Sequence, residues 1–163
     1  MEVKATLKNP FSEEERLSFI VENNHLKGWQ INETDTELQA LGYSDLEIAK
    51  GNKLSELANL KSTKLLTLNY GGNVYQVDSD SKINISGKVS QILLATSSGQ
   101  DIGAINWITK DNKVVSFSKE EFMAFATAVA AHTEAVIFKH DQLRTAVNNA
   151  TSIDEIKAIA WED

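Results

Sequence analysis

The strongest local signal in the sequence is the start of a long helix near residue 118. Ser118 and Glu121 form a capping box, in which the serine accepts the amide of Glu121 and the glutamate reaches back to the serine. Phe117 and Phe122 form a hydrophobic staple around this start. One face of the following helix is then marked by Phe122, Phe125, Val129, Val136, His140, Leu143 and Val147. A helix with such a face must bury it against other elements, which predicts a C-terminal unit built around it.

Two β-hairpins are predicted in the same half of the chain. Residues 65–77 place two apolar runs around Gly71-Gly72-Asn73, whose residues tolerate the positive φ of a tight turn. Residues 103–109 and 114–117 form the second hairpin, with its turn at 110–113. These hairpins supply strands that can cover the long helix.

Two shorter helices complete the C-terminal half. Asp78 to Ser81 can start a helix over about 80–97, and two faces of it are candidates for burial. One comprises Ile83, Gly87, Gln91 and Leu94, and the other Ile85, Val89, Ile92 and Thr96. Ser152 with Glu155 caps a final short helix that we expect to end near Trp161.

The N-terminal part alternates between predicted strands and helices. Residues 2–8 form a strand with Val3, Ala5 and Leu7 on one face, and residues 29–33 form a second strand. A capping box at Ser12 and Glu15 starts a helix that Gly28 ends. Its apolar stripe is Leu17, Ile20, Val21 and Leu26, with Phe19 at its flank. A short helix is expected over 35–41, ended by Gly42.

A helix over 45–64 connects these two parts. Ser44 with Glu47 gives it a capping box, and Tyr43 with Ile48 a possible staple. Leu54, Leu57 and Leu60 recur every three residues and so drift around the helix. A coiled coil, which needs alternating spacings of three and four, is the less favoured alternative.

The sequence therefore predicts an α+β protein. A small N-terminal β-α-β unit (1–43) is followed by a connecting helix (44–66) and a C-terminal α+β domain (67–163) with two β-hairpins and a long helix. Its expected core comprises Phe122, Phe125, Val129, Val136, Trp107, Val115 and Ile105.

Composition excludes several classes of protein. The net charge of −7 and only two arginines, Arg16 and Arg144, argue against nucleic acid binding. Without cysteine the chain has no disulfide, no thiolate zinc site and no cysteine nucleophile. No apolar run approaches the roughly 20 residues that span a bilayer, and the N-terminus lacks a secretory core. We expect a protein made in the cytoplasm with no membrane partner.

No motif indicates catalysis, a cofactor or a metal. His132 and His140 lie eight apart on one helix, whereas metal-binding pairs usually lie four apart, so packing or solvent exposure is favoured. The run from Asp78 to Ser81 lacks the glycine and terminal glutamate of a calcium loop and suits a helix cap better. The acidic pairs lie at helix starts or at the chain end, where the helix dipole or solvent explains them. Our expectation is therefore no catalytic, cofactor-binding or metal-binding residue.

The three tryptophans are the remaining candidates for a binding surface. Trp29, Trp107 and Trp161 each serve either as an anchor of a core or as a contact point in an interface. Anchoring is favoured for Trp107. For Trp161, near the chain end, the two interpretations are balanced.

A longer pattern of residues runs through the C-terminal half. It comprises 107–115 (Trp-Ile-Thr-Lys-Asp-Asn-Lys-Val-Val), 118–122 (Ser-Lys-Glu-Glu-Phe), 128–132, Leu143 and 150–161, with Val74-Tyr75-Gln76-Val77-Asp78 upstream. In order and spacing this resembles a family of small tailed-bacteriophage and prophage proteins encoded among tail and tail-fibre genes. The C-terminal domain of that family has no assigned biochemical function. Residues 4–8, 11–14, 19–25, 33–34 and 41–43 are similar to another phage-associated opening.

This resemblance implies a non-enzymatic phage tail protein, built into the tail or baseplate or attaching the fibres. The alternative is a tail-fibre assembly chaperone that is absent from the mature particle, and a remote alternative is a cell-wall-degrading tail enzyme. The implied partners are tail or tail-fibre proteins, together with further copies of this chain. The implied location is the host cytoplasm during assembly, and the virion tail for a structural component.

Overall fold

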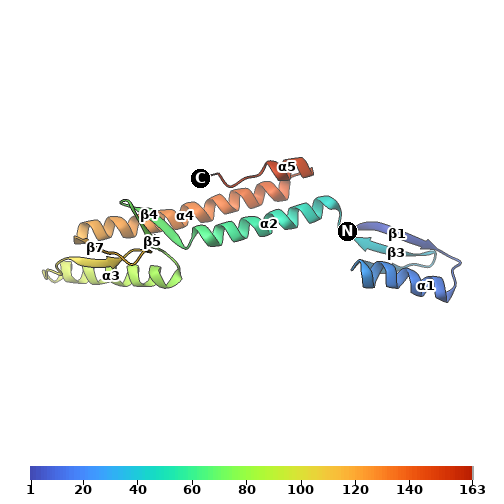
Figure 1. The fold of residues 1–163 in the computed structure, drawn as a ribbon, viewed down its shortest axis with the longest axis horizontal. Helices are drawn as coiled ribbons and strands as arrows, with labels where there is room; N and C mark the ends of the chain where they lie inside the picture. The colour runs from blue at the N-terminus through green and yellow to red at the C-terminus, as the bar shows by residue number, and fades with distance from the viewer. Residues whose placement is uncertain (163) are drawn as a thin grey trace. The chain divides into compact units, whose positions relative to one another are not determined.

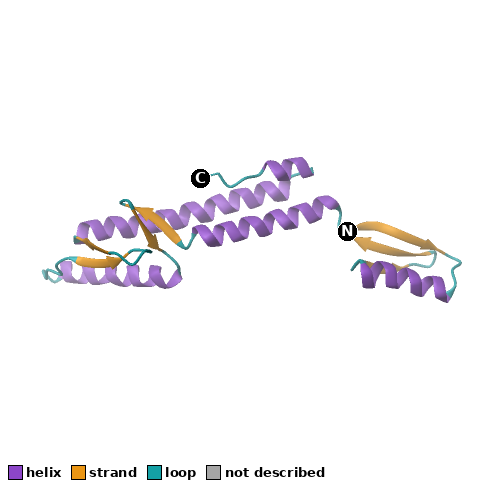
Figure 2. Ribbon diagram, viewed as in Figure 1, coloured by secondary structure: helices purple, strands orange, loops and turns teal. Residues whose placement is uncertain are grey.

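The computed structural model describes residues 1–162 and confirms the α+β class, with 56% of residues in helices and 20% in strands (Figure 2). The chain forms two compact units. The first holds Met1–Lys53 and Ala150–Ala158, and the second holds Leu54–Asn149 with the residues that follow Ala158. The boundaries at residues 43 and 66 stay a prediction about independently folding domains, because contacts within one folded state do not measure independent folding.

The first unit contains a three-stranded antiparallel sheet in the order β1-β3-β2 (Figure 1). Its strands are β1 (Glu2–Lys8), β2 (Gln30–Glu33) and β3 (Glu37–Gly42). The pairing of β1 with β3 shifts between Val3 and Ala5, which breaks the alternation of side chains along β1. Val3 is therefore half exposed, and the predicted shared face of Val3, Ala5 and Leu7 is wrong at its first residue.

The central strand β3 replaces the short helix predicted over 35–41. Its side chains alternate between half-buried and buried, and Leu38 and Ala40 are fully buried. Both of its edges are paired, to β1 and to β2. The helix prediction is wrong because Glu, Leu, Gln and Ala all favour helix locally, whereas here pairing on two sides determines the backbone.

One helical segment follows β1, and it changes pitch along its length. It comprises α1 (Glu13–Ile20), which begins at the Ser12–Glu15 capping box, and a π-helical segment, η1 (Val21–Leu26). The predicted stripe is wrong in part, since Leu17, Val21 and Leu26 are exposed. The side facing the sheet instead carries Arg16, Phe19, Ile20 and Asn23, and Arg16 Nη2 contacts Glu33 Oε2 of β2 at 2.9 Å. Gly28 ends the segment with φ of 69°, as predicted.

The connecting helix α2 (Asp45–Lys64) matches the predicted range of 45–64. Ser44 and Glu47 exchange the hydrogen bonds of the predicted capping box, at 2.8 and 3.2 Å. Tyr43 and Ile48 are both at least half exposed, so the possible staple does not bury these two side chains. The short helix α5 (Ile153–Ala158) begins at Ser152, whose hydroxyl accepts the Glu155 amide at 3.2 Å. It ends at Ala158, before the predicted end near Trp161.

The second unit places two hairpins against its longest helix (Figure 1). The first hairpin pairs β4 (Thr67–Tyr70) with β5 (Asn73–Gln76), and the second pairs β6 (Ile105–Ile108) with β7 (Val114–Phe117). Gly71 and Gly72 take φ of 55° and 79° in the first turn, and so fulfil the predicted turn chemistry. The helices α3 (Ser79–Ser97) and α4 (Lys119–Asn149) pack against each other.

The core of the second unit is rich in aromatic rings. Phe122 and Phe125 of α4 are fully buried, and Phe117 lies 5.9 Å from Phe122 and 5.5 Å from Phe125 between ring centroids. Val129, Val136 and Ile105 are also buried, as predicted, whereas Trp107 and Val115 are half-buried. Of the two ring pairs of Phe117, the first is edge-on and the second is stacked, and such ring pairs add to the stabilisation that burial alone gives.

Candidate interaction surface

The three tryptophans are divided between the two units. Trp29 belongs to the first unit, whereas Trp107 and Trp161 belong to the second. Trp107 packs edge-on against Phe122 near the start of α4, and Trp161 lies beside His140, about five helical turns further along α4. Of the predicted set of Trp107, Trp161 and Trp29, the two that belong to the second unit are therefore separate positions, and a role of the set in an interface stays a prediction.

Trp29 and Trp107 both have a packing role within their own unit. A Cβ atom placed on Gly42 would lie only 3.0 Å from the Trp29 ring, so the glycine backbone leaves room for the indole. Lys27 Nζ lies 4.9 Å from the centroid of the same ring, within the range of a cation–π contact. Trp107 joins the aromatic core with its ring centroid 5.2 Å from that of Phe122. Both indoles are half-buried, which fits anchoring with one edge in solvent.

Trp161 lines a cavity of about 640 Å³ with basic neighbours. Lys64 Nζ lies 5.8 Å from its ring centroid, and the His140 ring lies 6.5 Å away. His132, also at this cavity, contacts the Lys64 carbonyl oxygen through Nε2 at 2.8 Å. Burial, then the charges of Lys61 and Arg144, lower the pKa of His140 below its usual value. His132 and His140 thus have hydrogen-bonding and packing contacts. Residues 1–162 contain no cluster of three possible metal ligands, and the absence of a metal site stays a prediction.

Four of the carboxylates with a lowered pKa lie at helix starts. A backbone N–H donated at a helix start is the largest cause that lowers the pKa of Glu15, Glu47 and Glu155. The pKa of Asp78 is lowered in the same way, first by the Ser81 amide, which donates to Asp78 Oδ1 at 2.8 Å. These groups are capping groups, and the run from Asp78 to Ser81 is the helix cap that the sequence favoured over a calcium loop.

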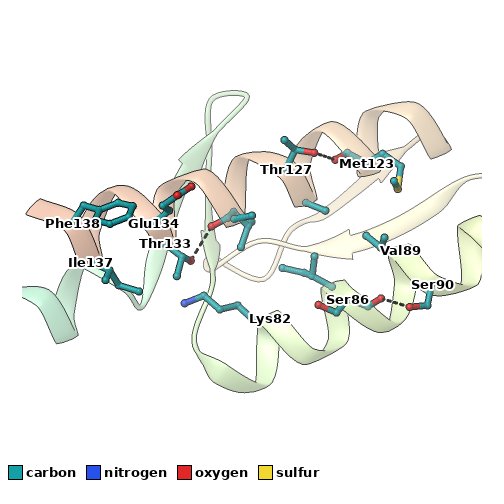
Figure 3. Close-up of a pocket in the computed structure, with 14 residues that line it drawn as sticks. Lys82, Ser86, Val89, Ser90, Met123, Thr127, Thr133, Glu134, Ile137 and Phe138 are labelled. Carbon is teal, nitrogen blue, oxygen red and sulfur yellow. Dashed lines mark hydrogen bonds between the residues drawn. The ribbon is translucent and has the colours of Figure 1, made fainter.

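An open apolar groove of about 840 Å³ lies between α3 and α4 of the second unit (Figure 3). We call it the α3–α4 groove. Its floor includes the buried side chains of Ile85 and Val129. Met123 lies toward one end, and Ile137 and Phe138 lie toward the other (Figure 3). Ile137 and Phe138 are 48% and 58% exposed, so apolar surface of appreciable size faces solvent here.

The sequence left open which face of α3 is buried. Of the two candidate faces, the one with Ile85, Val89 and Ile92 is turned inward. Ile85 and Val89 of this face also line the α3–α4 groove. The other face leaves Ile83 and Leu94 exposed at 68% and 70%, and neither of these two residues lines the groove.

Helix α4 has one further property that the analysis of apolar runs did not identify. By length and composition it could cross a membrane, and it is the one such helix within residues 1–162. The core helix of a globular unit meets the same two criteria. Phe122, Phe125, Val129, Val136 and Val147 of α4 are buried within the protein.

Comparison with known proteins places most of the chain in one family. A family model described as "Domain of unknown function (DUF4376)" matches residues 48–161, well over half of the chain. No curated protein and no solved structure gives a significant match.

Proposed function

The chain belongs to the family defined by the DUF4376 domain, and we propose that it is a non-enzymatic bacteriophage tail protein that acts by binding other proteins. In this role it is a structural or fibre-attachment component of the tail or baseplate. It is made in the host cytoplasm and carried into the virion tail. The proposal assigns it no catalytic residue, cofactor or metal.

The phage assignment rests on the residue pattern of the C-terminal half. The segments at 107–115, 118–122 and 150–161 keep the order and spacing of the tail-associated proteins that this chain resembles. All three lie inside the matched range of 48–161. The family description itself names no function, so this resemblance is the support for a tail.

The observation that carries the binding role is the α3–α4 groove. Phe138 and Ile137 expose apolar side chains at one end, and Ala130 is exposed in its middle. Apolar side chains at such a site gain free energy when a partner removes them from water, by roughly 25 cal/mol for each Å² buried. An exposed apolar groove of this kind supports a function in protein–protein binding.

A tail-fibre assembly chaperone is the second candidate for the same chain. It would use the same groove but release its partner, so its interface would be smaller or weaker than a permanent one. A cell-wall-degrading tail enzyme is the remote alternative, because it would need two carboxylates facing each other across a groove. Glu134 is the one carboxylate residue that lines the α3–α4 groove.

Mass spectrometry of purified phage particles, compared with the crude lysate, tests the proposal. We expect the chain at a fixed ratio to the known tail proteins in the particles. Its presence in the lysate and absence from particles would replace the structural role with the chaperone role. Co-purification with the tail fibre would then be the next measurement. Turnover of cell-wall polymer by the purified protein would contradict the non-enzymatic assignment.

Two neighbouring alanines provide a matched pair of variants for the groove. Ala130 and Ala131 are both exposed on α4, and Ala130 alone of the two lines the groove. Ala130→Asp should remove the chain from particles, whereas Ala131→Asp should leave it in place, with equal helix content by circular dichroism. Equal retention of both variants would show that the groove is not the binding surface.

A further inference from the structure

The side chains along the α3–α4 groove follow the spacing of a helix bundle. On α4, Met123, Ala126, Ala130, Thr133 and Ile137 are separated alternately by three and four residues. On α3, Lys82, Ser86 and Val89 are separated by four and then three. This alternation keeps one seam facing a neighbouring helix along its whole length. Both helices therefore present seams suited to further helices.

Small side chains in the middle of the groove allow a close approach. Ser86 of α3 and Ala130 of α4 are exposed, and they lie between the larger residues at the two ends. Helices pack with their axes about 8–10 Å apart when the residues at the contact are small enough. Small side chains along a seam are needed for a pair of helices to pack closely into the groove, whereas a flat, narrow ligand does not need them.

The charges of the groove are self-complementary. Lys82 of α3 and Glu134 of α4 lie toward the same end as Ile137, whereas Ser90 lies toward the Met123 end (Figure 3). The two helices are therefore antiparallel. A two-fold axis parallel to the two helices would place α3 of one copy over α4 of a second copy. Lys82 of each copy would then lie opposite Glu134 of the other copy, which gives two such contacts. Within residues 1–162, neither side chain forms a salt bridge.

We propose that the α3–α4 groove is covered by the same groove of a second copy of this chain, in a two-fold symmetric dimer with a four-helix bundle at its centre. This rests on the proposed function in that the groove is the contact surface, and it names a second copy of the chain as the partner that binds there. The symmetry makes the contact isologous, so that one patch serves both partners. The four helices then alternate in direction, as in an up-down bundle.

The mass of the purified full-length protein in solution is the first test. Sedimentation or light scattering should give twice the 18.0 kDa of one chain. Ala130→Asp should shift the mass to one chain, and Ala131→Asp should not. This measurement needs no phage particle, so its outcome is independent of whether the chain is retained in the tail. A mass of one chain at concentrations up to about 100 μM would overturn the dimer.

Reversing the two charges tests the arrangement itself. In the proposed dimer, K82E places like charges opposite each other twice, and E134K does the same with the opposite sign. Each variant alone should dimerise at least about tenfold more weakly than the natural chain. An equal mixture of the two variants should regain the two-chain mass, because every opposed pair then attracts. A dimer that neither variant weakens would have a different interface and would overturn the proposal.

Two controls separate this result from general effects. Lys157→Glu changes the net charge as K82E does, but at an exposed position in α5, and it should leave the dimer intact. Circular dichroism should show that both charge variants remain folded.

A monomer that floats with lipid vesicles would assign the groove to a membrane. A monomer that stays in solution and binds a tail protein through the groove would assign it to that partner. Both outcomes would overturn the dimer.

Discussion

At the scale of single residues, Phe122 links the start of the longest helix to the core of the second unit. Its side chain is fully buried, and its ring lies 5.2 Å from Trp107 and 5.7 Å from Phe125 between centroids. It is also the staple partner of Phe117, at 5.9 Å. Phe122 thus connects the capped start of α4 to the rings of Trp107 and Phe125.

Phe122→Ala should therefore lower the free energy of unfolding by about 3–5 kcal/mol, through lost burial and the cavity that remains. Tyr43→Ala is a suitable control, because Tyr43 is 61% exposed and should cost less than about 1 kcal/mol. Chemical denaturation of both variants measures the difference. A loss under about 0.5 kcal/mol for Phe122→Ala would show that this face of α4 is not the core.

His140 makes the stability depend on pH in a range where few other groups titrate. Burial, then Lys61 and Arg144, hold its pKa below the ordinary value of 6.5 in the folded protein. The unfolded chain therefore binds a proton more readily, and stability falls as the pH falls through 6.5. The capped carboxylates, whose pKa values are lowered from 4.5, lose their contribution only at lower pH.

His140→Gln should flatten this dependence. Thermal unfolding midpoints measured across the window between 4.5 and 6.5 should fall with pH for the natural chain and fall less for the variant. The same slope in both proteins would mean that His140 is protonated as easily in the folded state as in the unfolded state.

The sequence predicted buried residues well where one helix face was involved, and less well where two sides of an element were apolar. Phe122, Phe125 and Val129 were predicted correctly because a single seam of α4 carries them. The groove residues Lys82 and Glu134 were not predicted, because they lie fifty-two positions apart and line the same groove only through the packing of α3 on α4. No local spacing contains that information.

At the scale of elements, capping chemistry was the most reliable signal in this chain. Ser12, Ser44 and Ser118 each begin a helix with the reciprocal hydrogen bonds that their partner glutamates predict. At Ser152 only half of the box forms, because Glu155 instead accepts the Thr151 amide at 2.7 Å. The failure over 35–41 has another cause, since β3 pairs with β1, which is distant in sequence, as well as with the neighbouring strand β2.

Ser118→Ala should destabilise the second unit by about 1 kcal/mol. The Ser118 hydroxyl accepts the Glu121 amide at 3.2 Å, and its removal leaves one N–H at the start of α4 without that acceptor. Ser118→Asp keeps an acceptor at the same position and should be nearly neutral. Denaturant midpoints of the two variants measure the contrast, and equal losses would show that the hydroxyl acceptor does not matter here.

At the scale of the whole molecule, burial is distributed unequally between the two units. The aromatic core belongs to the second unit, and α4 alone buries five side chains. Helix α1 of the first unit buries none. The connecting helix α2 contributes to both units, because its residues up to Lys53 belong to the first unit and those from Leu54 onward belong to the second. Sequence periodicity located that helix, but it could not show how firmly each part of the chain is held.

Hydrogen exchange should reveal this difference directly. Amides of Phe122 to Val129 should exchange slowest, since they open only with the core, whereas amides of α1 should exchange faster through local opening. Phe122→Ala should then accelerate exchange in α4 and leave α1 nearly unchanged, if the aromatic core stabilises only its own unit. Equal acceleration in both segments would mean that the two units unfold together, and that α2 transmits the loss of the core into the sheet of the first unit.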